Sequence, residues 1–402
     1  MLSFHRLLRY HLTRHFSQLF FNTLNPKMAE MSGIQILDNA TIHDLLINLS
    51  NNETIEFRQV IERTLEEFSV GGERQYQPTP TVTNRPNGQN TLFRPFTSDS
   101  NIGAKITVEP APGLDGKKDP LHGVIVLCDG KGNPKGLLSS EEVTGYRTSM
   151  NVMVPFSWRR HVENIVIFGS GMQALWHTRL ILMLRGSEVR TITYASPNRH
   201  QVELLIATVS AENSARWKLQ CRFEFIDNTT SDFEENLGHR LSDVNCIFCT
   251  TPSKRPLFLA SHLPDKGARQ PLICAIGSWQ PDMIELDPSV LRLAVAPGAG
   301  YNPITREEKG VIFVDDREFA LQSSGELVQS HTDAADVIEL GQIIALRCGK
   351  ISSDSMTHSR AQKIDNFISE GLVVYKSIGV SLTDLTLSDA ILKAVRQRQQ
   401  KL

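Results

Sequence analysis

The stretch from Glu163 to Leu182 constrains the fold of this chain more than any other segment. It reads ENIVIFGSGMQALWHTRLIL, a short apolar run that breaks at a glycine turn and continues in a helical pattern. In such a unit Gly169 allows the tight turn, Gly171 lets the backbone approach a pyrophosphate, and Ala174 lets the helix pack closely on the strand. The helix N-terminus adds free N–H groups and a positive dipole end. The segment therefore predicts a dinucleotide-binding turn of the form G-x-G-x-x-A.

The segments after this turn alternate between strand-like and helical patterns. The strand-like runs IVIF, VRTITY, FEFI, VNCIFCT and LICAIG occur in this order, with helical patterns at 172–185 and 198–212. This alternation predicts a Rossmann-type doubly wound parallel sheet. Earlier in the chain, alternating segments at 105–108 and 123–127 predict antiparallel strands. The predicted fold class is α/β, with a second, α+β domain that C-terminal helices complete.

Length and composition indicate a globular protein of two domains. The chain has 402 residues, of which 40% are apolar and 21% charged. A formal net charge of -2 gives no reason to expect nucleic acid or an anionic membrane as a partner. No run approaches the ~18 apolar residues that a membrane-spanning helix needs. The six cysteines lie in or near apolar stretches, which is typical of reduced, buried thiols, and no metal site is predicted.

The N-terminal segment differs in composition from the rest of the chain. Residues 1–29 contain no Asp or Glu, and arginines alternate there with Leu and Phe, as in a mitochondrial transit peptide. The alternative is a dispensable extension, because Met28 and Met31 precede the expected domain start. We expect a location in the mitochondrial matrix in the first case and in the cytoplasm in the second. The expected divisions are an extension at 1–30, a first domain at 31–155 that 332–402 completes, and a dinucleotide-binding domain at 156–331.

Several local motifs, taken in order, resemble the ornithine cyclodeaminase/mu-crystallin family over roughly Ile34 to Ile391. The resemblance implies a homodimer in which the first domain, completed by C-terminal helices, forms the dimer interface and part of the substrate site. It also implies a nicotinamide cofactor in the middle domain. The matching motifs are Gly145-Tyr146-Arg147-Thr148, Gly169 to Ala174, Thr250-Thr251-Pro252-Ser253, Gly277 to Asp282 with Glu285-Leu286-Asp287, Val314-Asp315-Asp316, Ser324-Gly325-Glu326-Leu327, Glu339-Leu340-Gly341 and Lys376-Ser377-Ile378-Gly379.

The second strand of the nucleotide-binding unit bears on the choice of cofactor. An Asp or Glu at its end usually accepts hydrogen bonds from the ribose diol and repels a 2′-phosphate, yet the segment 189–202 contains no carboxylate. Asn198-Arg199 resembles the Asn-Arg pair with which phosphate-bound family members hold that group, although two or three residues late. A guanidinium suits a phosphate by charge and by its fork geometry. The alternative is a solvated loop arginine. NADP(H) is therefore favoured over NAD(H).

The glycine turn and the resemblance together give a set of candidate cofactor-binding residues. They come from the glycine turn, from the end of the second strand and from motifs that resemble cofactor-binding segments of the family. The set is Arg147, Thr148, Gly169, Ser170, Gly171, Met172, Gln173, Asn198, Arg199, Thr250, Ile276 and Ser377.

The candidate catalytic residues are Lys105, Arg147 and Asp282. In the family, a strand Lys and the Arg of an Arg-Thr pair bind the carboxylate of an amino or imino acid, and Lys105 and Arg147 stand at matching positions. Two cations on one small acid would fix its α-carbon against the nicotinamide, which is the positioning that hydride transfer requires. The alternatives are an outward-facing strand lysine and a salt-bridged structural arginine. Asp282 matches an Asp of the mu-crystallin branch, and its alternative role is a loop or helix cap.

The chain also departs from the family at two places. Ornithine cyclodeaminase carries an Asp in the glycine loop after the fifth strand, where this chain has Trp279, and an indole cannot accept a proton or pair with an ammonium. The family usually has an arginine shortly after a Gln-Pro pair, but here Gln77-Pro78 is followed by Thr79. Arg85 and Arg94 could replace this arginine, although neither is in register with the family motif. His177, on the nucleotide helix, is expected to be packed rather than catalytic.

These residues predict an NADP(H)-dependent oxidoreductase of the ketimine reductase or amino-acid dehydrogenase kind. It would act on the C=N bond of a small carboxylate-bearing imine, or in reverse on an amino acid. Reduction of a protonated imine needs little acid catalysis, so loss of the cyclodeaminase Asp is tolerable for this chemistry. Two alternatives stay open. One is ornithine cyclodeaminase, which converts ornithine to proline and ammonia; the other is a non-catalytic NADPH-dependent binding protein.

Overall fold

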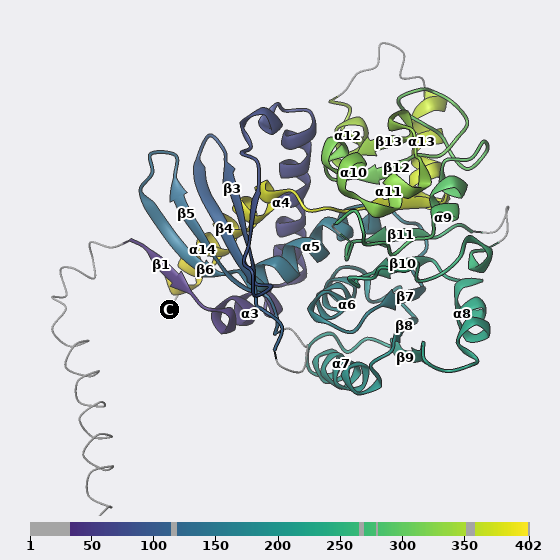
Figure 1. The fold of residues 1–402 in the computed structure, drawn as a ribbon, viewed down its shortest axis with the longest axis horizontal. Coiled ribbons are helices and arrows are strands. Elements are labelled where there is room, and N and C mark those ends of the chain that lie inside the picture. The colour runs from purple at the N-terminus through teal and green to yellow at the C-terminus, as the bar shows by residue number, and fades with distance from the viewer. Residues whose placement is uncertain (1–32, 114–118, 265–268, 279, 351–357, 401–402) are drawn as a thin grey trace, which may run out of the picture.

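The structure is a computed structural model of the chain. It describes residues 33–113, 119–264, 269–278, 280–350 and 358–400. Two β-sheets lie side by side, with helices packed on and between them (Figure 1). The extension at 1–30 lies outside the described residues. Among the residues that are described, no helix has the length and hydrophobicity needed to span a membrane.

The first sheet contains six strands in the order β1-β6-β5-β4-β3-β2. Strand β1 pairs with β6 in parallel and the other neighbours are antiparallel, as the alternating segments predicted. The strands are β1 (Gln35–Leu37), β2 (Thr81–Asn84), β3 (Asn90–Thr97), β4 (Asn101–Glu109), β5 (His122–Asp129) and β6 (Pro134–Ser139), and the helices of this part are α3 (Asn39–Ile47), α4 (Asn51–Ser69), the 3-10 turn η1 (Glu73–Tyr76) and α5 (Ser140–Ser157).

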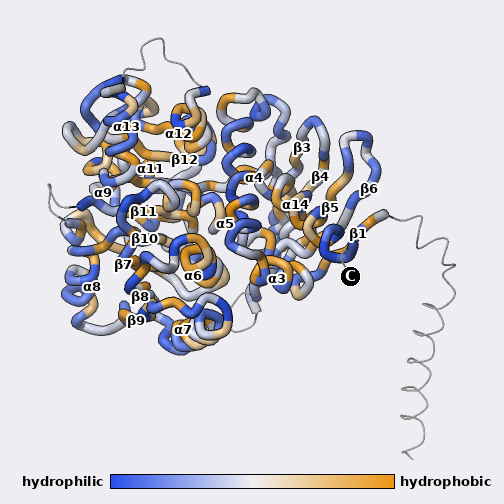
Figure 2. Tube along the Cα trace, turned by 180° about the vertical axis from the view of Figure 1, so that it is seen from behind, coloured by the Kyte–Doolittle hydropathy of each residue, from blue (hydrophilic) through white to orange (hydrophobic). Residues whose placement is uncertain are grey.

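Helix α4 shows why these segments fold as they do. Ser50 and Glu53 form a reciprocal capping box at its start, which satisfies backbone N–H groups that would otherwise lack partners. Phe57, Ile61 and Leu65 recur at helical spacing and are buried, while the other side of the helix is hydrophilic (Figure 2). The buried side packs against α5 and against the C-terminal helix α14 (Ser381–Gln399).

The second sheet contains eight strands in the order β13-β12-β14-β11-β10-β7-β8-β9, and all of its pairs are parallel. The predicted doubly wound sheet is therefore confirmed. Because both faces are covered by helices, the strands are nearly continuous apolar runs. The strands are β7 (Asn164–Phe168), β8 (Thr191–Ser196), β9 (Arg222–Asp227), β10 (Cys246–Cys249), β11 (Leu272–Ala275), β12 (Ile312–Val314), β13 (Val337–Glu339) and β14 (Val373–Lys376).

Helices connect these strands in the usual alternating manner. Strand β7 lies between β8 and β10, so the strand order reverses beside it, and ligands of such sheets bind outside the carboxyl ends of the strands at this point. The helical elements are α6 (Met172–Arg185), α7 (Arg199–Glu212), η2 (Asn213–Trp217), α8 (Phe233–Leu241), η3 (Ala260–His262), α9 (Pro288–Ala294), α10 (Arg317–Ser323), α11 (Gly325–Ser330), η4 (Ala334–Asp336), α12 (Leu340–Arg347) and α13 (His358–Glu370).

The C-terminal third is divided differently from the expectation that 332–402 belongs with the first domain. Strands β13 and β14 lie inside the second sheet, where β14 pairs with both β11 and β12. Helix α14 packs on β3, β4, α4 and α5 of the first part, and α12 lies between β13 and α4. The strands concerned have three and four residues between helices, so their sequence pattern is too short to distinguish them from helical surroundings.

The two sheets are joined firmly where α4 meets α12. A Cβ added at Gly341 would lie 1.9 Å from the Leu65 carbonyl oxygen, so only glycine permits this close approach of the helices. Nearby, Arg74 forms ion pairs with Asp316, at 2.6 Å, and with Glu339. The motif around Gly341 therefore serves to dock the first sheet on the second.

Candidate functional site

The predicted glycine turn lies at the carboxyl end of β7. Gly169 has a φ of +113°, and a Cβ there would lie 2.5 Å from the Thr250 hydroxyl oxygen, so both backbone and space require glycine. Gly171 precedes α6, and a Cβ added to it would meet nothing within 4 Å. No side chain of the described residues caps the helix, so the N–H groups of its first turn have no side-chain partner. This geometry suits a pyrophosphate.

Several other candidate cofactor-binding residues lie at the same edge of the sheet. Thr250 follows β10, and its backbone N–H and hydroxyl both donate to the Phe168 carbonyl oxygen, at 3.0 and 2.7 Å. Ile276 follows β11 and donates its N–H to the Cys249 carbonyl oxygen at 3.0 Å. Ser377 directly follows β14. The structure therefore brings these three residues to the strand ends beside the glycine turn, while Met172 and Gln173 form the first turn of α6.

The end of the second strand presents hydroxyl groups instead of a carboxylate. The Ser170 and Ser196 hydroxyl oxygens are 3.2 Å apart, and Ser196 ends β8. Asn198 caps α7 by accepting a hydrogen bond from the Gln201 N–H at 3.1 Å. Arg199 begins α7 with its side chain 60% exposed, lies over the Phe225 ring and is 3.5 Å from Asp227. Its guanidinium is thus largely accessible, although Asp227 would compete with a phosphate for it.

Lys105 and Arg147, the two predicted substrate cations, meet inside the protein. Lys105 on β4 and Arg147 on α5 are 4% and 5% exposed, so neither is an outward-facing residue. Both donate to the same carboxylate oxygen, Oδ1 of Asp384 on α14, at 2.9 Å from Lys105 and 3.1 Å from Arg147. The Lys105 ammonium also donates to the Thr144 hydroxyl at 3.1 Å. The salt bridge foreseen as an alternative for Arg147 is thus present, and it is shared with Lys105.

Arg94 adds a third cation to this group. Strand pairing sets Arg94 on β3 directly opposite Lys105 on β4, although in sequence it is out of register with the family motif. Among the described residues its guanidinium has no hydrogen-bond partner. A Cβ at Gly379 would lie 3.1 Å from one Arg147 nitrogen and 3.4 Å from one of Arg94, so both guanidinium groups border this glycine. Arg85 is exposed beyond the end of β2.

Burial and like charges shift the protonation of this group. The pKa of Lys105 is lowered to about 8, mainly by burial; Asp384 opposes this shift, and Arg147 and Arg94 add to it. Burial also lowers the pKa of Arg94, with Arg147 as the next cause. Although burial raises the pKa of Asp384, Arg147 and Lys105 together hold it below its ordinary value. The three cations therefore outnumber the two nearby carboxylates, Asp384 and Asp315, and this excess of positive charge favours an incoming anion.

Sequence reasoning missed Asp384, and it missed the contact between two of its own motifs. Asp315, at the end of β12, is fully buried and accepts hydrogen bonds from the Ser377 hydroxyl at 2.7 Å and the Gly379 N–H at 2.7 Å. It thereby holds the loop that leads from β14 into α14. The one local signal for Asp384 is a buried carboxylate in the first turn of a largely apolar helix, five residues after Gly379.

A buried ionic cluster lies below the loops of this edge. Glu285, Glu326 and Lys376 are at most 1% exposed. The Lys376 ammonium donates to the Ser278 hydroxyl and carbonyl oxygens, both at 2.5 Å, and lies 4.0 Å from Glu285 and 3.7 Å from Glu326. Glu285 accepts from the Thr251 and Gly277 N–H groups, both at 2.7 Å. The cluster therefore ties together the loops after β10, β11 and β14.

Asp282 is not brought to the substrate cations. Its side chain is 58% exposed and pairs with Lys254 at 2.6 Å, and the hydrogen bond from Lys254 lowers its pKa. Trp279 lies outside the described residues. His177 is fully buried between the Ser149 hydroxyl and the Gln173 carbonyl oxygen, and burial lowers its pKa to about 4, so it is a neutral packed residue as expected. In the described part of the chain, no group of three or more His, Cys, Asp or Glu could hold a metal ion.

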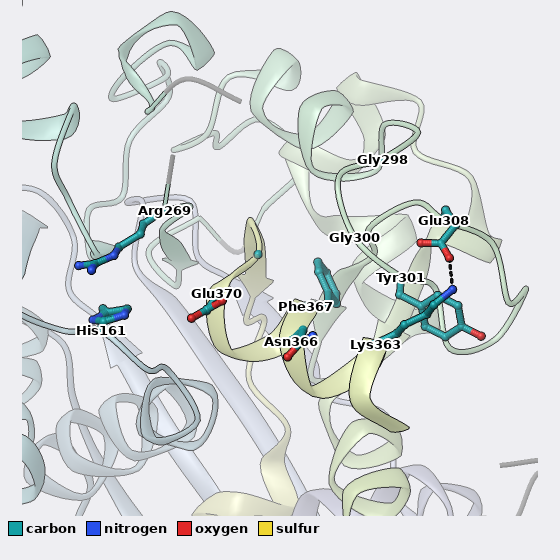
Figure 3. Close-up of a pocket in the computed structure, with 11 residues that line it drawn as sticks. His161, Arg269, Gly298, Gly300, Tyr301, Glu308, Lys363, Asn366, Phe367 and Glu370 are labelled. Atoms are coloured by element: carbon teal, nitrogen blue, oxygen red, sulfur yellow. Dashed lines mark hydrogen bonds and ion pairs between the residues drawn. The ribbon is translucent and has the colours of Figure 1, made fainter. Parts of the chain in front are cut away.

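A cavity of about 650 Å³ lies away from this site. Its lining includes His161, just before β7, and Glu370, just before β14, so it opens at the amino ends of the parallel strands. Figure 3 shows His161 and Arg269 on one side of it and Lys363 paired with Glu308 on the other. Because the glycine turn lies at the opposite ends of the strands, this cavity is not the candidate cofactor site.

Comparisons with known proteins show what the chain resembles in sequence and in fold. No family model matches the chain. An uncharacterized cyclodeaminase of Dictyostelium discoideum is 24% identical over 318 residues, which cover 77% of this chain and 80% of that protein. A probable ornithine cyclodeaminase structure from Bordetella pertussis superposes with a TM-score of 0.63 at 20% identity, covering 91% of this chain and 98% of that one.

Two solved structures with bound ligands have a similar fold. A Thermococcus litoralis Δ1-pyrroline-2-carboxylate reductase in complex with NADH and L-proline gives a TM-score of 0.66 at 16% identity, covering 91% and 98% of the two chains. An archaeal alanine dehydrogenase dimer with bound NAD gives 0.65 at 16% identity, covering 91% and 97%. The chain is thus similar in sequence to an uncharacterized cyclodeaminase, and it shares its fold with a probable ornithine cyclodeaminase, an imino-acid reductase and an alanine dehydrogenase.

Proposed function

We propose that the protein is an NADP(H)-dependent oxidoreductase that reduces the C=N bond of a small carboxylate-bearing imine, or oxidises the corresponding amino acid. The observation that carries this proposal is the group formed by Arg94, Lys105 and Arg147 near the carboxyl edge of the second sheet. Cations with unfilled donors suit a substrate carboxylate, and relatives of this fold include an imino-acid reductase with bound NADH.

The glycine turn and strand ends fit a dinucleotide. The space above Gly171 would admit a pyrophosphate, and the buried hydroxyl of Thr148 has no hydrogen-bond partner among the described residues. Thr250, Ile276 and Ser377 would lie toward the nicotinamide. When bound, the nicotinamide supplies or accepts the hydride. The chain's own part is to hold the substrate carboxylate with its cations, to exclude water by burial, and so to fix the imine carbon at one distance from the ring.

The charges favour imine reduction over ornithine deamination. Ornithine carries a second amine that needs a carboxylate partner, but the two acids beside the cations, Asp315 and Asp384, are buried and engaged with the chain's own groups. Asp282 is exposed and paired with Lys254. A protonated imine needs no such partner, because its positive nitrogen already accepts the electron pair that hydride delivers.

A screen of NADPH oxidation tests this proposal. Cyclic imino acids and 2-oxo acids mixed with amines would each be supplied to the full chain with NADPH. Ornithine would be supplied with NAD+ or NADP+, because its deamination begins with hydride transfer to an oxidised cofactor, and nicotinamide absorbance and ammonia release would both be recorded. We expect NADPH consumption with at least one imine and no ammonia from ornithine. Ammonia release from ornithine with no net change in the oxidised cofactor would establish the cyclodeaminase alternative. Tight NADPH binding without turnover of any compound would establish the binding-protein alternative.

The cofactor preference gives a separate prediction. Since Ser196 ends β8 and no carboxylate takes its place, NADPH should bind more tightly than NADH. One charge-assisted hydrogen bond from Arg199 to a 2′-phosphate contributes about 1.5 kcal/mol or more, which corresponds to roughly tenfold. Arg199→Ala should bring the two dissociation constants together, as measured by cofactor fluorescence. Arg240→Ala, at another exposed arginine on α8, is the control and should keep the preference. Equal affinities in the unmodified protein would contradict the NADP(H) assignment.

We also propose that the protein is a homodimer that pairs through the outer face of the first sheet. Side chains alternate along each strand, and those opposite in direction to Lys105 are mostly apolar and only partly buried within one chain. Such a face on a folded domain marks an interaction surface, and a second copy would cover it. Its residues include Phe93, Ile102, Ile106, Val124, Val126 and Leu137.

The effect of a charge on this face tests the dimer. Val126→Lys places an unpaired ammonium at the middle of the sheet, and burying it between two copies costs several kcal/mol. We expect the unmodified protein to have a dimer's mass by light scattering and the variant to be monomeric. Leu204→Lys, at a 56% exposed position on α7, is the control and should remain dimeric. A monomeric unmodified protein would rule out this interface.

A further inference from the structure

Helix α14 brings one carboxylate between the cations of the candidate substrate site. Asp384, in the first turn of the helix, is fully buried, and its Oδ1 atom accepts hydrogen bonds from both Lys105 and Arg147. Its second oxygen, Oδ2, has no hydrogen-bond partner in the described part of the chain. A buried carboxylate is costly to retain unless its charge is used. The single use visible here is to hold two cations from one atom.

The cations could not keep this arrangement without the acid. Lys105 faces Arg147 from α5 and Arg94 from β3, so it has two like charges as neighbours. Thr144, also on α5, offers a neutral hydroxyl, and the β5 residue opposite Lys105 is Ile125. Among the described residues, Asp384 is therefore the one charged group facing the Lys105 ammonium that favours its charged form. A buried lysine beside two guanidinium groups would otherwise tend to lose its proton.

The path of the chain links this carboxylate to the cofactor side of the molecule. Asp315, at the end of β12, holds the loop from Ser377 to Gly379, and α14 begins two residues after that loop. Asp384 then lies one turn into the helix. The carboxyl edge of the second sheet and the cations of the first sheet are thus connected by a short segment that is fixed at both ends.

We propose that Asp384 is the positioning residue of the substrate site: it holds Lys105 and Arg147 toward the substrate carboxylate and keeps the Lys105 ammonium charged near neutral pH. The proposal rests on the proposed function only in taking these cations as the substrate's anchor. Asp384 acts through Lys105 and Arg147 and need not touch the substrate. An uncharged side chain of the same shape should therefore lower the pH at which the Lys105 ammonium loses its charge. It should also weaken the contacts that hold Lys105 and Arg147 in place.

The test measures carboxylate binding against pH, because binding can be followed with or without turnover. The probe is pyrrole-2-carboxylate, a ring carboxylate that cannot accept hydride, titrated into the full chain saturated with NADPH while the cofactor fluorescence is recorded from pH 6 to 9.5. Since the pKa of Lys105 is about 8, affinity in the unmodified protein should fall as pH rises through about 8. In Asp384→Asn this fall should occur about one to three pH units lower.

The midpoint of the fall is the readout, rather than the affinity at a single pH. Removal of one negative charge also strengthens the attraction of a cationic site for any anion, so the variant's affinity at pH 6 can move in either direction. Asp389→Asn is the matched control. Asp389 is 5% exposed on the same helix, but it pairs with Lys135 and Lys393 and not with Lys105 or Arg147. The control variant should keep the midpoint of the unmodified protein.

The possible outcomes separate this proposal from the proposed function. An unchanged midpoint in Asp384→Asn, with affinity reduced equally at every pH, would show that Asp384 only supports the fold. If Asp384→Asn does not fold, as judged by lost NADPH binding, Asp384→Glu decides: a retained carboxylate should restore a midpoint near 8, and a lower midpoint would overturn the proposal. Absence of imine turnover in the unmodified protein, with a shifted midpoint in the variant, would remove the reductase function and leave the role of Asp384 standing.

Discussion

Replacing Lys105 with Met should lower kcat/KM for a carboxylate-bearing imine roughly 30- to 1,000-fold, which corresponds to a loss of about 2–4 kcal/mol of transition-state stabilisation. The affinity for NADPH should stay nearly unchanged. The substitution removes one partner of a desolvated charge pair and leaves Asp384 to Arg147 alone. Because Lys105 lies on β4 of the first sheet and the glycine turn follows β7 of the second, the pyrophosphate site should be unaffected by the change. Steady-state kinetics gives the first quantity, and NADPH fluorescence titration gives the second.

Two further variants locate the effect. Arg94→Met should also reduce kcat/KM, because its guanidinium has no hydrogen-bond partner in the described part of the chain and lies across the strand pair from Lys105. Lys135→Met is the control, since this lysine lies in the same sheet but pairs with Asp389. It should alter stability more than kinetics. A loss in Lys135→Met as large as that in Lys105→Met would mean that the first result reports damage to the sheet and not a missing anchor.

The sequence predicts the parts of the fold that depend on local pattern. The glycine turn at Gly169 and the helix after it require particular residue types at fixed short spacing, so the turn could be recognised directly. The place of β14 between β11 and β12 could not be recognised. That position depends on which strands meet after folding, and runs of three or four apolar residues carry no information on their neighbours.

The same distinction applies to the site. Lys105 and Arg147 were found through motifs that resemble a family, whereas Arg94 reaches them through strand pairing and Asp384 through the return of α14. The Lys105 and Asp384 side chains that meet at 2.9 Å are 279 positions apart in the chain. Asp282 shows the opposite failure, because its position in a motif suggested chemistry but its side chain lies on the surface beside Lys254.

The buried cluster around Lys376 explains why short motifs far apart in the chain occur together. Thr251 and Gly277 donate backbone N–H groups to Glu285, and the Glu285 N–H donates to Glu326 at 2.8 Å. A Cβ at Gly277 would lie 2.1 Å from the Thr251 carbonyl oxygen, so the loops cross with no space for a side chain. Each motif therefore supplies one part of a single polar core, and that core positions the loops at the carboxyl ends of β10, β11 and β14.

Lys376→Met should produce the largest loss of stability among these variants, about 3–5 kcal/mol in urea unfolding. It removes the one cation of the cluster and leaves Glu285 and Glu326 buried with no opposing charge. Lys363→Met, at an exposed pair with Glu308, is the control and should cost at most about 1 kcal/mol. Adding Glu326→Gln to Lys376→Met should recover part of the loss, because one uncompensated charge is then removed.

The pH dependence of this variant distinguishes charge from packing. Burial raises the pKa of Glu285 above its ordinary value, so the folded state binds a proton more strongly than the unfolded state, and the stability gained from that proton is lost as pH rises through the folded pKa. Loss of the lysine removes the main group that lowers this pKa. The difference in unfolding free energy between Lys376→Met and the unmodified protein should therefore shrink as pH falls from 8 toward 5. A difference that is independent of pH would show that the N–H donors from Thr251, Gly277 and Ser278 already neutralise Glu285, and that Lys376 acts by filling space.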